Sequence, residues 1–203
     1  MTSKGRIRGS ARDGRARSAA VAPLVDDLVH SATATLTAAG TQAEKSLRAT
    51  LTASDGPDGG ASVEASWPSS TGRPSAAEQA ARSWSAQGVR VVRAALAVAP
   101  DSDAARRARL RRKAQQALGD DGLAATALTA AAGVDEARDL LVQLIDQAGE
   151  RAVEELRTGL LDRVAAQVAL ERAAVGEVLA DPDLADDAAS RLRLRLAVLK
   201  GLT

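Results

Sequence analysis

The chain has 203 residues, with 27 Lys and Arg against 26 Asp and Glu, and a formal net charge of +1. It contains no Cys, Tyr or Phe, which excludes disulfides and Cys-ligated metal sites and leaves a core of Ala, Leu and Val. Because small side chains bury little area, at about 25 cal/mol per Å², we expect an elongated helical packing, or a partner, to contribute to stability.

The first 52 residues predict a basic arm followed by a helical hairpin. Residues 1–18 are basic, contain Gly and Ser and lack apolar periodicity, which indicates a flexible, disordered arm. Apolar residues at helical spacing then predict a helix over 19–36. Gly40 is expected to end it, and Thr41 with Glu44 has the form of a capping box for a second helix. Residues 19–52 are therefore expected to fold back on themselves.

A change of composition marks the main boundary of the chain. Residues 53–74 are rich in Gly, Pro and Ser and predict a flexible linker. Ser75 with Glu78 repeats the capping-box pattern and opens a helical bundle that we expect to occupy residues 75–203. Within it, Pro100 should stop the first helix and Gly119 should end the second.

The longest periodic run predicts one long helix. Between Glu136 and Ala180 apolar residues recur at steps of mainly three and four. Such a helix would reach about 65 Å at 1.5 Å per residue, unless one of its glycines bends it. The last segment, 184–199, is also expected to be helical, because no partner strand is predicted elsewhere. The fold class is therefore all-α, an elongated helical bundle.

Nothing in the sequence predicts catalysis. There is no phosphate-binding Gly-rich loop ending in Lys and Ser or Thr. His30 is the only histidine, so a His-based metal site or a Ser-His-Asp triad has little to build on. Adjacent acidic residues, which could in principle act in general acid–base catalysis, are better explained as solvated helix faces and helix caps. We therefore expect no enzyme activity, no cofactor and no metal site.

Three surfaces are candidates for binding. The predicted helix that contains residues 106–113 is basic and can bind the phosphates of anionic lipid or of nucleic acid. It has no aromatic residues between its basic residues to stack on bases. The uncharged segment 122–134 is too short to span a bilayer, so it either packs against a helix or touches a membrane. The basic residues are Arg106, Arg107, Arg109, Arg111, Arg112 and Lys113; the apolar positions are Leu123, Leu128 and Val134; the bundle seam is Leu141, Ile145, Leu156, Leu160, Val164 and Val168.

About half the chain resembles a known family. Trp84 with Gly88-Val89, the block from Leu118 to Val134, the run Leu140–Ile145 and the segment Leu156–Val164 with Glu171-Arg172 follow in order. This order resembles the C-terminal helical region of actinobacterial dynamin-like GTPases. The resemblance implies a stalk-like bundle with an apolar segment that contacts membrane. The GTPase head of that family has no counterpart here, so no catalytic residue is carried over.

The expected function is therefore a non-catalytic, stalk-like helical module that acts in membrane association or self-assembly. The alternatives are a soluble oligomerisation scaffold, in which the long helix forms a coiled coil, and a nonspecific nucleic-acid-binding protein. The expected partners are a second copy, a GTPase head or an anionic membrane surface, with nucleic acid ranked below these. The expected location is the cytoplasm, with peripheral attachment at the inner face of the membrane.

Overall fold

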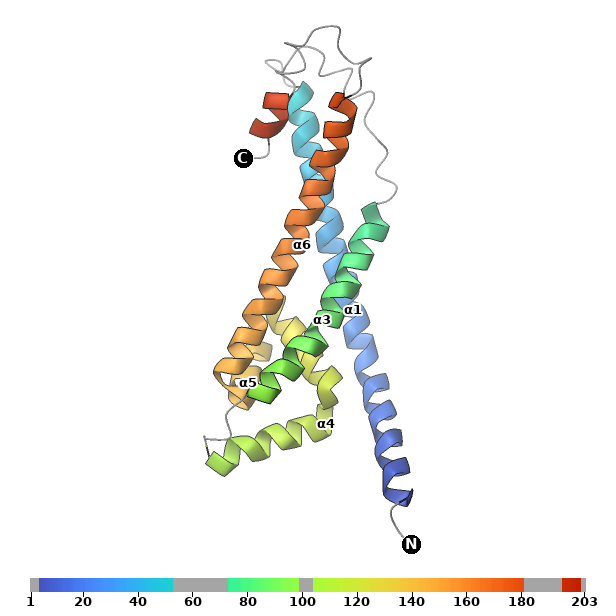
Figure 1. Ribbon diagram of the computed structural model, residues 1–203, viewed down its shortest axis with the longest axis vertical. Coiled ribbons are helices and arrows are strands. Elements are labelled where there is room, and N and C mark those ends of the chain that lie inside the picture. The colour runs from blue at the N-terminus through green and yellow to red at the C-terminus, as the bar shows by residue number, and fades with distance from the viewer. Residues whose placement is uncertain (1–3, 53–72, 99–103, 181–194, 202–203) are drawn as a thin grey trace. The chain divides into compact units, whose positions relative to one another are not determined.

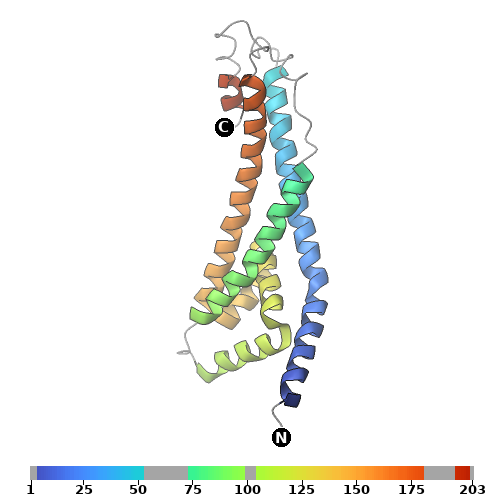
Figure 2. The ribbon, with the colours of Figure 1, turned by 45° about the vertical axis from the view of Figure 1, so that its right-hand side comes forward.

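A computed structural model describes residues 4–52, 73–98, 104–180 and 195–201, and all of its regular structure over these ranges is helical. The main helices are α1 (Lys4–Thr52), α3 (Arg73–Val98), α4 (Ala104–Ala131), α5 (Asp135–Ile145) and α6 (Gln147–Ala180) (Figures 1 and 2). Residues 195–200 form a further short helix. The predicted all-α helical bundle is confirmed. Of the predicted linker at 53–74, residues 53–72 lie outside the described residues, whereas Arg73 and Pro74 already belong to α3. Residues 99–103, which include Pro100, also lie outside them.

The chain divides into two compact units. The first contains residues 1–32 and 78–161, and the second contains residues 33–77 and 162–203. The main boundary is therefore not the sequence change at 53–74, because both units draw on segments from both sides of it. Each unit has its own core, made of helices that are far apart along the chain.

The predicted hairpin over residues 19–52 is wrong, because α1 continues through Gly40 to Thr52. Gly40 is buried where a side chain would meet the Arg73 Cδ at 3.0 Å and the Gln167 Cγ at 3.2 Å. The lack of a side chain at Gly40 therefore allows neighbouring side chains to approach closely, and the residue does not end a helix. The Thr41 hydroxyl donates to the Thr37 carbonyl oxygen at 2.9 Å, as a residue inside a helix does, and caps nothing.

The N-terminal arm also differs from its prediction, since α1 begins at Lys4. Residues 4–18 contain five Arg, which favour helix, but only two Ala and also three Gly, which disfavour it. Local propensity therefore does not by itself explain the helix in this region. Pro23 lies within the same helix.

The helix ends predicted for the middle of the chain agree with the structure. α3 ends at Val98, and α4 has a break at Gly119, where φ is 69° and ψ is 179°. This backbone region is accessible essentially only to Gly, so the residue type explains the position of the break. α4 consequently has two segments, 104–118 and 120–131, that run in different directions (Figure 1).

The single long helix predicted for 136–180 is wrong, because the chain breaks at Asp146 into α5 and α6. Asp146 has a φ of 53° and a ψ of −139°. Its N–H donates to the Val142 carbonyl oxygen at 2.8 Å, and its own carbonyl oxygen accepts from the Gly149 N–H at 2.9 Å. Gly149 then lies against the Leu141 carbonyl oxygen, which a β-carbon would approach to 2.8 Å. The glycine thus permits the close return of α6 onto α5.

The cores consist mainly of Leu, Val and Ala, as the composition predicts. In the first unit the buried side chains lie on α3, α4, α5 and the beginning of α6, together with Ala32 of α1. In the second unit they lie on the later part of α1, the first turns of α3, α6 and the short C-terminal helix. The largest fully buried members are Trp84, Val92, Leu128, Leu141 and Leu156 in the first unit and Leu36, Leu47 and Val175 in the second.

Candidate functional site

The basic segment predicted from the sequence forms the first part of α4. Residues 104–118 carry six basic residues and no acidic residue. The side chains of Arg109, Arg112 and Lys113 are exposed, and that of Arg111 is partly exposed. Arg106 and Arg107 are helical, but their side chains are not among those described. Because positive charges occur on all sides of this helix, solvation or a polyanionic partner suits it better than packing in a core.

Leu110 interrupts the basic segment with an apolar side chain that is 44% exposed. A basic helix that presents a Leu to solvent has the two elements of interfacial binding to an anionic surface. One Leu supplies little apolar area, however. Phosphate contact is therefore the main interaction that this segment can make.

The uncharged segment 122–134 is a largely buried helix that ends in an exposed turn. Leu123 and Leu128 are 3% and 1% exposed. Gly133, with φ of 105°, follows the helix; its N–H donates to the Ala130 carbonyl oxygen, and the Val134 N–H donates to that of Thr129. These two bonds are a Schellman cap. The segment therefore packs within the first unit, and its exposed apolar side chains are Ala132 and Val134, the latter 41% exposed.

The predicted seam residues lie on two helices, since the break at Asp146 falls among them. The first three members are buried, and the last three are partly exposed. The division between the units falls after Leu161, so the last two members, Val164 and Val168, belong to the second unit. The six residues are therefore apolar core and half-buried positions of two units rather than one continuous seam.

Trp84 holds the first unit together. The indole is 1% exposed, and its Nε1–H donates to the Leu156 carbonyl oxygen at 2.8 Å. A buried Trp needs such an acceptor, because an unsatisfied indole N–H is costly in an apolar core. Gly88, one turn further along α3, is also buried, and a β-carbon there would meet the Leu128 side chain at 3.0 Å. Close packing of α3 on α4 therefore depends on Gly88.

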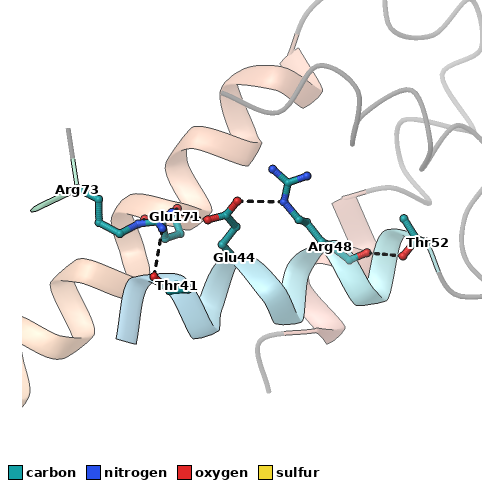
Figure 3. Close-up of polar contacts among 6 residues, drawn as sticks. All are labelled: Thr41, Glu44, Arg48, Thr52, Arg73 and Glu171. Carbon is teal, nitrogen blue, oxygen red and sulfur yellow. Dashed lines mark hydrogen bonds and ion pairs between the residues drawn. The ribbon is translucent and has the colours of Figure 1, made fainter. Parts of the chain in front are cut away.

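The second unit contains a charge cluster that the sequence did not predict (Figure 3). The Arg73 guanidinium donates through Nε and Nη2 to the two carboxylate oxygens of Glu171, at 2.6 and 2.8 Å. It also donates to Glu44 at 2.7 Å and to the Thr41 hydroxyl at 3.4 Å. Arg48 donates to the other oxygen of Glu44 at 3.0 Å. The cluster joins α1, α3 and α6 within this unit.

Burial and pairing set the protonation of this cluster. Only 7% of the Arg73 side chain is exposed, against 17% of that of Glu44. Burial raises the pKa of the Glu44 carboxyl, but hydrogen bonds from Arg73 and Arg48 outweigh burial, so the pKa of Glu44 lies below its ordinary value. The bond to Glu171 raises the pKa of Arg73. Two arginines balance two glutamates, which makes the cluster a structural clasp rather than an open ligand site.

No catalytic arrangement is found in the part of the chain that the structure describes. His30 is exposed on α1. Among these residues no group of three or more His, Asp and Glu side chains could hold a metal ion. None of the described helices combines the length and the apolar character that crossing a membrane requires.

Comparison with known proteins gives no relative: no family model, curated protein or solved structure matches the chain.

Proposed function

We propose that the chain is a non-catalytic helical module that associates with anionic membrane surfaces through the basic segment, residues 104–118 of α4. The observation that carries the proposal is the concentration of six basic residues, without an acid, on a helix whose described Arg and Lys side chains reach solvent. The role fits a stalk-like module of the kind found in actinobacterial dynamin-like GTPases, which would place the chain in the cytoplasm at the inner face of the membrane.

The burial of the segment 122–134 narrows the mode of contact. Its leucines support the packing of the first unit and would have to leave that core to enter a bilayer. Salt-sensitive, peripheral attachment through lipid phosphates is therefore favoured over insertion. Each Lys or Arg near an anionic leaflet contributes about 1 kcal/mol. Several such contacts make a reversible attachment of useful strength.

The test is co-sedimentation of the chain with liposomes of purely neutral lipid and of lipid with an anionic fraction, at low and moderate salt. We expect binding to the anionic liposomes only, weakening as salt rises. Changing Arg109, Arg112 and Lys113 to Glu should weaken binding by about 100-fold or more, on the basis of about 1 kcal/mol for each lost contact. The matched control reverses the same number of exposed charges on α6, at Arg151, Arg157 and Arg172. That control should retain most of the binding.

The other outcomes separate the alternatives. Salt-resistant binding to both kinds of liposome would contradict the electrostatic proposal and indicate insertion of 122–134. Binding to duplex DNA but not to anionic liposomes would indicate a nonspecific nucleic-acid-binding protein. A folded, helical sample that binds neither would leave a soluble oligomerisation scaffold, which sedimentation analysis would show as a defined oligomer. Self-association is measured on the same sample.

A further inference from the structure

The hinge between α5 and α6 is a single residue. α5 ends at Ile145 and α6 begins at Gln147, so Asp146 alone turns the chain. Its φ of 53° with a ψ of −139° lies outside the left-handed helical region, where residues with a β-carbon are rarely found. The bent form therefore strains the backbone at Asp146, and helical angles at this residue would remove the strain.

The sequence on either side of Asp146 is compatible with a helix that does not turn. No proline occurs between residues 135 and 180, and apolar residues keep helical spacing across the hinge. Local preference therefore opposes the turn. The bent form must be held by contacts between α6 and the helices that precede it.

Two such contacts join a residue before the hinge to a residue after it. In the first unit the Trp84 indole donates to the Leu156 carbonyl oxygen at 2.8 Å. In the second unit Arg73 pairs with Glu171 through two hydrogen bonds, at 2.6 and 2.8 Å (Figure 3). Because the members of each pair lie on opposite sides of the hinge, the same contacts can form between two copies of the chain.

A short, strained hinge between packed elements favours exchange of one element between identical chains. The open hinge is free of strain, and the packing contacts are formed again with the other copy. We infer that two copies of this chain exchange α6 by opening at Asp146, so that α6 of each copy packs against α3 and α5 of the other. In the exchanged dimer Asp146 is helical, and α5 and α6 lie on one axis.

The test begins with refolding of the full chain from urea at two chain concentrations that differ by about 100-fold, followed by size-exclusion chromatography with light scattering. We expect a dimer whose fraction rises with concentration. An exchanged dimer must then be distinguished from folded monomers that associate through their surfaces. Arg138 on α5 and Glu150 on α6 allow this distinction, because their ion pair joins the two sides of the hinge.

Changing Arg138 and Glu150 together to Cys places one thiol on each side of the hinge in a chain that has no other cysteine. Both side chains are about half exposed, so their loss should leave the fold intact. In a continuous helix these positions of one chain, twelve residues apart, are separated by about 18 Å, too far for a short bifunctional maleimide. The maleimide should therefore link two chains in the dimer fraction and one chain internally in the monomer fraction. Neither single Cys variant should give a covalent dimer on a denaturing gel.

Substitutions at the hinge should shift the equilibrium in opposite directions. Asp146→Gly removes the strain from the bent form and should raise the Kd of the dimer by about 25-fold or more, since a relief of at least about fivefold applies to each of two chains. Asp146→Ala favours helix and should lower this Kd by about tenfold. The matched changes at Asp162, which is exposed on α6 and helical in both forms, should alter the Kd by less than about twofold.

Three results would overturn the inference. The first is that the wild type and Asp146→Ala both remain monomeric at the higher concentration. The second is a dimer whose thiols are linked only within each chain, which would show surface association of folded monomers. The third is an equal Kd for Asp146→Gly and Asp146→Ala, which would remove the hinge from the equilibrium. None of these results bears on liposome binding by residues 104–118, so the two proposals fail independently.

Discussion

Replacing Trp84 tests the core of the first unit most directly. A Trp side chain buries about 150–250 Å² of surface, so complete truncation removes about 4–6 kcal/mol of burial at 25 cal/mol per Å². The hydrogen bond from Nε1 to the Leu156 carbonyl oxygen contributes about 1 kcal/mol more. Because alanine retains part of this surface and area sums are upper estimates, we expect Trp84→Ala to lower the free energy of unfolding by about 4–5 kcal/mol, within the usual range for such changes. Trp84→Phe, which retains an aromatic ring, should cost about 1–2 kcal/mol.

The assay is urea unfolding followed by circular dichroism at 222 nm, which does not depend on the removed fluorophore. Leu161→Ala is the matched control, since Leu161 belongs to the same unit and is 61% exposed. The control should change the free energy of unfolding by less than about 0.5 kcal/mol. The reasoning is refuted if Trp84→Ala costs no more than this control, or if Trp84→Phe matches the wild type. A change in the slope m would show that unfolding is not a single transition and would require each unit to be fitted by itself.

Three further predictions concern other buried contacts. Gly149→Ala should lower the free energy of unfolding by about 1–3 kcal/mol, because its β-carbon would lie 2.8 Å from the Leu141 carbonyl oxygen. The control Gly176→Ala, whose β-carbon would have no neighbour within 4 Å, should raise the free energy of unfolding by about 1 kcal/mol. Equal effects of the two changes would refute the close contact at Gly149. The pKa of Glu44 is lowered in the folded chain, so the ionised carboxylate stabilises the fold above its ordinary pKa of 4.5, and this stabilisation is lost as the pH falls below that value. Glu44→Gln should therefore make the free energy of unfolding depend less on pH in the acid range. An unchanged dependence on acid pH would count against the clasp. Changing Leu156 and Leu160 to Asp should unfold the chain or dissociate any oligomer, since Leu156 is 0% exposed, and unchanged helicity and oligomeric state would contradict its place in the core.

The helical class was predictable because helix signals are local. Apolar spacing, Pro and Gly positions and the absence of strand patterns act within a few residues, so the C-terminal end of α3 and the break at Gly119 followed from the sequence. The continuity of α1 and the break at Asp146 did not. In α1, Gly40 lies inside the helix, where a β-carbon would meet the side chains of Arg73 and Gln167, which are distant in the sequence. At Asp146, the apolar period on either side fits one helix and two helices equally well. Local periodicity therefore does not distinguish the observed structure from the predicted one at either position.

The basic segment could be predicted from the sequence, whereas the charge cluster around Arg73 could not, because only the first depends on residues that are close together in the chain. The basic segment is a contiguous run, so its composition alone identified it, and the structure shows that its described Arg and Lys side chains reach solvent. The clasp joins Arg73 to partners 29 and 98 residues away, and no local pattern relates them. The available signals were a Gly next to polar residues at 40–44 and a Glu on the apolar period of α6. Each of these is common in helices, so neither identified the cluster.

The break at Gly119 explains how one helix can serve two purposes. Before it, α4 carries six basic residues and no acid; after it, the helix is uncharged from Gly122 to Ala131 and largely buried. In a straight helix the basic segment 104–118 would continue along the axis of the buried segment 120–131. Burial of the second segment would then bring the charged side chains of the first closer to the core, where unpaired charge is costly. With φ of 69° and ψ of 179°, Gly119 turns the basic segment away from the axis of the buried one (Figure 2). Since this backbone region is closed to residues with a β-carbon, the glycine determines where the charged surface separates from the core.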